Sequence, residues 1–235
     1  MFERKSGVLL LAGLGFFVLA FLSNGLVPWL MYAKTPELTV EETIERQMVI
    51  PDADKISDIN KLKVHRVNVV SQFKMMADLY HESFTNHYAD GWKKWTNAEW
   101  KQQAADTIRH GRNVYVAEGC WHCHSQFIRP VSNEEKRWGP VSKSWEYNNE
   151  LQRPVMFGTR RVGPDLTREG GRHSNDWHAA HFFRPRDTSP LSVMPDYPWF
   201  FDGDAGRPNR HGFAIITYMQ WLGSWMPTYP DYGQY

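Results

Sequence analysis

The sequence has no long run of basic residues, and its formal charge is nearly balanced, with 27 Lys and Arg against 26 Asp and Glu. A nucleic-acid partner is therefore not expected. We find no internal repeat and no low-complexity tract, and the last 130 residues show no convincing strand pattern. That part is predicted to be mainly helical with long loops. Cysteine is limited to two residues, which excludes a zinc site made of two Cys-x-x-Cys pairs.

Aromatic residues, in contrast, are abundant: the chain has 11 Trp, and 14% of its residues are aromatic. Such a content is unusual for a water-exposed protein. It suggests a bulky apolar group to enclose, a membrane interface, or both.

The N-terminus contains a long uncharged segment. From Ser6 to Ala33, 28 residues carry no formal charge, and a bilayer core needs about 20 apolar helical residues. We therefore predict one transmembrane helix, with Trp29 and Tyr32 as interfacial anchors. Arg4 and Lys5 precede it, which predicts a cytoplasmic N-terminus with the bulk of the chain outside. The alternative is a cleaved signal peptide, but the run exceeds a usual signal-peptide core, so we expect an uncleaved anchor.

The next segment, residues 35–105, is the least informative. Thr39-x-x-Glu42 and Thr96-x-x-Glu99 are possible capping boxes for two helices. Residues 55–84 show no single period, so an amphipathic helix and an irregular strand pair both remain open. The tract "HYADGWKKWTNAEW" is rich in aromatics. It is expected to pack in a core, or else to contact lipid headgroups or a partner subunit.

Three further helices are predicted. The first leads up to the cysteines, because apolar or small residues recur there at helical spacing: Trp100, Ala104, Ile108, Gly111 and Tyr115. The second, "NDWHAAHFF", is expected to be capped by Ser174 and to stop at Pro185. The third is the pattern "GFAIITYMQWLGSW" near the C-terminus.

The two cysteines belong to the motif "CWHCH", in which Cys120, Cys123 and His124 form C-x-x-C-H. A zinc site would need more ligands of the right spacing, although His173, His178 and His181 offer nitrogens. A redox dithiol would need a βαβ context, which is not visible. Covalent haem attachment explains all three residues: two thiols on one helical turn reach two vinyl groups, and the following histidine ligates the iron.

The surroundings favour this haem c interpretation. Gly163-Pro164-Asp165-Leu166 lies about 40 residues on, where small cytochromes c carry a similar loop. The Pro164 carbonyl could accept the proton on Nδ1 of His124 and leave Nε2 for iron. Gly111 and Tyr115 resemble the glycine and aromatic pair of the N-terminal cytochrome c helix, and Ile215 and Tyr218 resemble their counterpart on the C-terminal helix.

Met194, in "SVMPDYPW", is the predicted sixth ligand, because it lies in a loop 70 residues after His124 and before the last helix. Met156 is a weaker alternative, Met219 is expected to pack in the last helix, and His173, His178 and His181 could instead supply a second histidine ligand. Haem propionates are anionic, and we expect one or two of four arginines to hold them: Arg129, Arg160, Arg161 and Arg172. Trp121 and Trp177 are expected to wall the haem.

Four stretches carry a more specific resemblance: "CHSQFIRP", "RVGPDL", "GGRHSNDWH" and "MPDYPW". Together they resemble the monohaem cytochrome c subunit of cbb3-type haem–copper oxidases, closely over residues 111 to about 224. The resemblance implies attachment through Cys120 and Cys123 and axial ligation by His124 and Met194. It also implies that the chain takes electrons from another c-type cytochrome and passes them to the b haem of a multi-span haem b/copper catalytic subunit.

The resemblance sets the expected organisation. The fold class is mainly α: a transmembrane anchor (1–34), a partly helical linker or insertion (35–105), a class I cytochrome c-like domain (106–226) and a C-terminal tail (227–235). The expected location is a bacterial cytoplasmic membrane, with one pass through the lipid bilayer and the haem domain on the periplasmic side. Two departures are a longer linker and the stretch "RWGPVS" at 137–142, where the family has Arg-Tyr-Gly-x-Tyr-Ser. The alternatives are a free membrane-tethered electron carrier and the cytochrome subunit of a nitric oxide reductase.

Overall fold

The computed structural model describes residues 2–34, 37–48 and 68–225. The chain divides into two compact units, Met1–Glu37 and Leu38–Tyr235. Within the described residues the regular elements are helices, and the only β-type pairing is two isolated bridges. The predicted mainly α fold class is confirmed.

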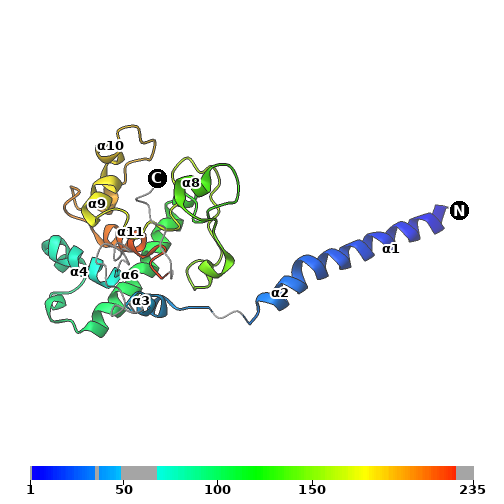
Figure 1. The fold of residues 1–235 in the computed structure, drawn as a ribbon, viewed down its shortest axis with the longest axis horizontal. Helices are drawn as coiled ribbons and strands as arrows, with labels where there is room; N and C mark the ends of the chain where they lie inside the picture. The colour runs from blue at the N-terminus through cyan, green and yellow to red at the C-terminus, as the bar shows by residue number, and fades with distance from the viewer. Residues whose placement is uncertain (1, 35–36, 49–67, 226–235) are drawn as a thin grey trace, which may run out of the picture. The chain divides into compact units, whose positions relative to one another are not determined.

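The first unit is one continuous helical rod, drawn in blue in Figure 1. It consists of α1 (Phe2–Phe21), a π-helical turn η1 (Leu22–Leu26) and α2 (Val27–Tyr32). The segment Lys5–Tyr32 is long and apolar enough to cross a membrane, and its side chains are exposed. This agrees with the predicted single-pass anchor.

The second unit is centred on two helices that cross, α6 (Asn97–Ala117) and α11 (Arg210–Trp221) (Figure 1). Gly111 lies where they cross. A Cβ added to Gly111 would meet the carbonyl oxygen of Ala214 at 2.1 Å, so only glycine permits this approach. The rings of Tyr115 and Tyr218 meet beside it, with centroids 5.6 Å apart. The predicted crossing of these helices is therefore present.

The predicted capping box at the start of α6 is also present. The backbone N–H of Thr96 donates to Glu99 (2.6 Å), and that of Glu99 donates to the Thr96 hydroxyl (3.3 Å). At Thr39 and Glu42 the same reciprocal bonds, 2.8 and 3.2 Å, start α3 (Val40–Met48). Both pairs satisfy backbone donors that a helix N-terminus leaves free.

The aromatic tract packs in the core, as its first interpretation predicts. Helix α4 (Val69–Leu79) packs on α6 and α11, and it is followed by α5 (His81–His87), which contains Phe84, and by η4 (Trp92–Lys94). The ring centroids of Tyr88, Trp92 and Phe213 lie 4.2, 5.4 and 5.2 Å from that of Phe84. The sequence left residues 55–84 open between a helix and a strand pair. Residues 68–84 are mostly helical, and residues 55–67 lie outside the described residues.

Helix α3 is tied to the same core by polar contacts. Arg109 of α6 makes two hydrogen bonds to Glu41, of 2.8 and 2.7 Å, and one of 2.8 Å to Glu150. These bonds from Arg109 hold the pKa of Glu41 below its usual value. The indole N–H of Trp221 donates to the hydroxyl of Thr43 (2.9 Å), and both side chains are fully buried. The start of the second unit is thus fastened to its last helix.

Short helices and loops complete the unit: α7 (Cys120–Cys123), α8 (Glu134–Trp138), η5 (Ser144–Tyr147), α9 (Asn175–Phe183), α10 (Pro185–Thr188) and η6 (Pro198–Phe200). Ser174 occupies the N-cap position of α9, as predicted, but its side chain makes no capping bond to the backbone. The last helix ends at Trp221, earlier than its sequence pattern suggests, because Gly223 adopts a left-handed conformation (φ +79°).

The predicted limits at residues 34, 105 and 226 stay predictions. Helix α6 runs through residue 105 without interruption, and both sides of that position belong to the second unit. Compactness does not say which part would enclose a cofactor, so the division between linker and haem domain is not tested by the fold.

Candidate functional site

Cys120 and Cys123 lie on α7, a single helical turn that Gly119 begins with φ of +67°. Residues three apart on a helix lie on the same face. Both cysteines are free thiols; Cys120 is buried and Cys123 exposed. The turn ends at His124, whose backbone is extended and whose N–H donates to the Cys120 carbonyl (2.9 Å). The two thiols and the imidazole therefore belong to one short, hydrogen-bonded segment.

The imidazole of His124 is held by the loop at 163–165. Its Nδ1 lies 2.9 Å from the Pro164 carbonyl. A carbonyl oxygen can only accept, so Nδ1 donates and the neutral ring leaves Nε2 without a proton. A Cβ on Gly163 would lie 2.3 Å from Cε1 of this ring, so the glycine lets the loop lie flat against the imidazole. Burial lowers the pKa of His124, which favours the neutral form.

Asp165 fixes the segment that follows the histidine. Its buried carboxylate accepts from the Ser125 hydroxyl (2.5 Å), the Phe127 N–H (2.9 Å) and the Thr167 N–H (2.8 Å). Charge-assisted bonds of this kind are the strong ones. Asp165 therefore holds together the loop whose carbonyl accepts from His124 and the segment 125–127 that follows His124.

Met194 lies in the loop between α10 and η6, half-buried against the apolar core. Three residues later, Tyr197 is buried, and its hydroxyl hydrogen-bonds the Cys120 thiol. This bond links the Met194 loop to the cysteine turn. Of the alternative methionines, Met156 is half-buried against the core and Met219 is buried in α11.

This donor set fits a covalently bound haem better than the other two interpretations. An attacking thiol in a redox dithiol has a lowered pKa, but burial raises the pKa of Cys120 to about 12, despite the hydrogen bond from Tyr197. Among the described residues, no three His, Cys, Asp or Glu side chains converge as metal ligands, whereas a structural zinc site takes four ligands. Two thiols on one turn, followed by an imidazole whose Nε2 carries no proton, are what attachment of haem c requires.

Residues 96–211 match the family described as cytochrome c oxidase, mono-heme subunit/FixO. The chain belongs to this family. No curated protein matches it. Membership of the FixO family implies a c-type haem and a catalytic subunit as partner, and the matched residues contain both cysteines, His124 and Met194.

The four arginines predicted to hold propionates of a FixO haem differ in how far they are engaged. The Arg161 guanidinium is bonded to other side chains of the protein. Its Nε donates to Ser125 (2.8 Å), both terminal nitrogens donate to Glu134, and the group lies over the Trp138 ring at 5.2 Å. The other three arginines have different contacts. Arg129 donates to the Phe157 carbonyl (2.6 Å), Arg172 lies 4.0 Å from Glu169, and Arg160 is exposed.

The histidines predicted as alternative ligands of the FixO chain have other contacts. His173 and His181 stack on opposite sides of Trp177, at 3.7 and 4.5 Å between centroids, and Nδ1 of His181 lies 2.6 Å from the Thr188 hydroxyl. His178 is buried. His173 also lies 3.7 Å from the buried Glu169 carboxyl. Trp177 is thus enclosed by histidines, while Trp121 is half-buried and stacks on His122 (3.8 Å).

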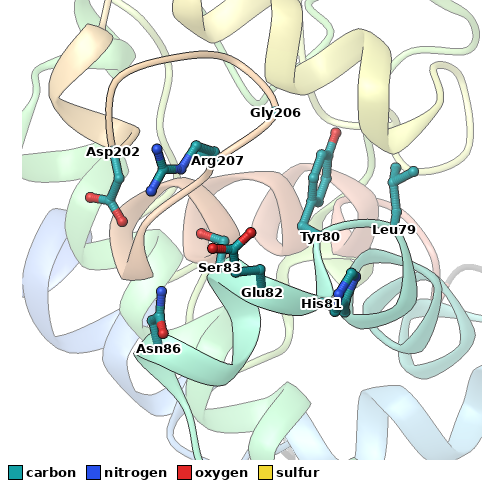
Figure 2. A pocket seen from close by; sticks show the side chains of 9 residues that line it. All are labelled: Leu79, Tyr80, His81, Glu82, Ser83, Asn86, Asp202, Gly206 and Arg207. Carbon is teal, nitrogen blue, oxygen red and sulfur yellow. The ribbon is translucent and has the colours of Figure 1, made fainter.

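A separate hollow of about 140 Å³ lies between α5 and the loop that precedes α11. In Figure 2, Asp202 and Arg207 come from that loop and Glu82, Ser83 and Asn86 from α5. Charges of both signs line it, and none of the predicted site residues does. The hollow is therefore distinct from the FixO site.

The sequence did not predict the residues that hold the site residues in place by hydrogen bonds. Asp165 and Ser125 were visible as polar residues directly after Pro164 and His124, but nothing in their spacing says that they bond to each other. Glu134, which also accepts from the Arg129 N–H (2.8 Å), carries no sequence signal. Tyr197 stands in the quoted "MPDYPW" stretch, but its contact with Cys120 depends on the folded loop.

Proposed function

We propose that this chain is the electron-relay subunit of a cbb3-type oxidase. It takes single electrons from a c-type cytochrome donor and passes them to the b haem of a multi-span haem–copper catalytic subunit. The observation that carries the proposal is the bond from Nδ1 of His124 to the Pro164 carbonyl. It leaves Nε2 free to ligate iron directly after a Cys-x-x-Cys turn, in a chain of the FixO family.

Covalent attachment follows from the two thiols. The thiols of Cys120 and Cys123 would hold the haem through two thioether bonds, each formed by addition of one S–H to a vinyl group, which needs no oxidant. The single turn of α7 sets the separation of the two sulfurs, and the Tyr197 hydroxyl orients the buried Cys120. A haem bound there supplies one-electron chemistry, with iron alternating between its ferrous and ferric states.

The remaining residues are proposed to position the haem and its ligands and to set its reduction potential. Pro164 keeps the proton on Nδ1 of His124, and Gly163 makes room for the ring. Met194 would supply the second protein ligand of the iron, and its thioether would favour the ferrous state. Arg129, Arg160 and Arg172 are the candidates to hold the propionates, and the contacts of Arg161 with Glu134 give it a structural role instead. Trp121 lies on the cysteine turn and is proposed to cover one edge of the haem.

The anchor supports a location in a bacterial cytoplasmic membrane. Arg4 and Lys5 precede the span that ends at Tyr32, and basic residues stay on the cytoplasmic side. The second unit is then periplasmic, where haem attachment to thiols takes place.

Purification of the full chain in mild detergent tests the proposal. We expect one covalent haem c that survives acidic acetone and a co-purifying multi-span subunit with b haem. The double variant Cys120→Ala, Cys123→Ala should retain no covalent haem. A haem-bearing chain that purifies alone would favour a free tethered carrier, and a catalytic subunit that reduces nitric oxide but not oxygen would favour a nitric oxide reductase.

A further inference from the structure

Trp199 is a large apolar side chain that the second unit holds out in solvent. It belongs to η6 and is 53% exposed. Its indole N–H donates to the Glu118 carboxylate (3.1 Å), and its backbone carbonyl accepts from the Asn209 side chain (2.9 Å). The ring is thus fixed through both its side chain and its backbone, so its exposure does not come from a loose side chain.

A chain of contacts leads from Trp199 to the cysteine turn. The ring centroids of Tyr197 and Trp199 lie 5.3 Å apart in an edge-to-face arrangement. Tyr197 is buried, and its hydroxyl bonds the Cys120 thiol. Under the proposed function the sulfur of Cys120 carries the haem, so a single buried side chain separates the exposed indole from the point of haem attachment.

A relay subunit needs two separate places of electron exchange. The catalytic subunit stays bound while the donor comes and goes, so both partners cannot use the same edge of one haem. The cysteine turn offers two routes to the surface. Cys123 is itself exposed, whereas the buried Cys120 is connected to the surface through Tyr197 and Trp199.

The Trp199 side of the turn is acidic. Glu118 bonds the indole, and Asp196 is exposed three residues before it. Arg210, at the start of α11, acts on His110 and lowers its pKa. His110 precedes Glu118 by two turns of α6, about 12 Å, which exceeds the distance over which exposed charges act at physiological salt. The charge next to the indole is therefore negative.

The Cys123 side has the opposite charge beside it. The backbone N–H of Arg160 donates to the His122 carbonyl (2.9 Å), directly before Cys123, and Arg160 is exposed. A partner with basic residues at its contact surface is attracted to the Trp199 side and repelled from the Cys123 side.

We propose that Trp199 is the contact through which the electron donor reduces this chain, and that the donor is a soluble one-electron carrier with basic residues around its cofactor. The inference rests on the proposed function. The donor loses one electron and this chain gains it; no bond forms and no proton is transferred. An exposed tryptophan suits such a contact because tryptophan is enriched among the residues that dominate binding, and opposite charges raise the rate of association.

The test follows electron exchange between the assembled, detergent-solubilised complex and mitochondrial cytochrome c, a basic haem protein, by stopped-flow absorbance. The downhill direction is measured, because one contact serves both directions. Trp199→Leu should lower the second-order rate constant about 5- to 30-fold, the range for loss of one interface hot spot. Trp199→Phe, which keeps a ring, should restore most of it. Trp145→Leu, which removes another exposed tryptophan (44%), should leave it unchanged.

Glu118→Gln tests the charge separately, because the amide oxygen can still accept from the indole N–H. At low salt its rate constant should be about 2- to 4-fold below that of the wild type and should depend less on ionic strength. Dithionite, a small reductant, should reduce every variant at the wild-type rate, because the Cys123 side remains exposed. The Tm and the reduction potential should also stay at their wild-type values.

Wild-type exchange in Trp199→Leu would overturn the proposal. So would an equal loss in Trp145→Leu or a loss with dithionite, because either would indicate a general disturbance. Slower reduction of haem b with normal cytochrome c exchange would overturn it as well, since the indole would then face the catalytic subunit. If the wild type never retains haem b, the proposed function itself fails. If the wild type retains haem b and the variants do not differ, only the inference about Trp199 fails.

Discussion

Replacing Gly163 with alanine tests the support of His124 directly. The added Cβ would lie 2.3, 2.6 and 2.7 Å from Cε1, Nδ1 and Nε2 of the imidazole. Ordinary contact begins at about 3.5 Å, so the ring or the loop must move by about 1 Å. The hydrogen bond from Nδ1 to Pro164, now 2.9 Å, would then exceed the length at which such bonds count.

The expected effect is large for a single methyl group. Overpacking costs about 1–3 kcal/mol, and loss of the hydrogen bond adds about 1 kcal/mol. For a unit of this size each kcal/mol lowers Tm by about 2–4 °C, so we expect a fall of about 5–15 °C. The reduction potential and the spectrum of the haem should change as well, because the orientation of Nε2 changes with the ring.

The assay is thermal unfolding of the purified full chain, followed by circular dichroism and haem absorbance, with potentiometric titration in parallel. Gly91→Ala is the matched control, because a Cβ there meets nothing within 4 Å. Gly163→Ala with the Tm, spectrum and potential of the wild type would refute the view that this loop holds the imidazole.

Three further predictions concern the ligand and two buried carboxyl groups. Met194→Ala should abolish a methionine–iron charge-transfer band and lower the reduction potential, whereas an unchanged spectrum would return the ligand role to the histidines. Asp165→Asn should destabilise the chain by about 1–3 kcal/mol and raise the potential, because a buried negative charge favours ferric iron; the exposed Asp90→Asn is the control, and an unaltered potential would contradict the electrostatic part. Burial raises the pKa of Glu169 to about 7 from 4.5, although Arg172 opposes the shift. The folded chain therefore holds a proton that the unfolded chain has lost, and stability should fall by about 3 kcal/mol as pH rises from 4.5 to 7. Glu169→Gln should remove this fall, seen as a Tm difference from the wild type that grows between pH 5 and 8; a constant difference would contradict it.

The sequence predicted the elements that depend on local chemistry. The uncharged run predicted the anchor, the two Thr-x-x-Glu pairs predicted the starts of α3 and α6, and Gly111 predicted the helix crossing. The Pro164 contact with His124 was also predictable, since a C-x-x-C-H motif and a Gly-Pro loop each carry their own signal.

What remained hidden depends on contacts between distant residues. Helix α4 has a helical period that the sequence interpretation missed: its buried residues lie three or four positions apart on one face, at Val69, Val70, Phe73, Met76 and Ala77. Arg161 looked like the other arginines, and only the folded chain shows its bonds to Glu134. The π-helical turn before Pro28 is likewise set by the backbone and not by side-chain pattern.

The bond between Thr43 and Trp221 joins residues 178 positions apart, and this distance governs the order of assembly. Contacts between the two ends of a chain form only after both ends have been made, and closing so long a loop is slow. The second unit therefore cannot close until its final helix has been made. Cys120 and Cys123 are made about 100 residues before that helix, so under the proposed function the still-open chain would expose both thiols to haem before Cys120 is buried.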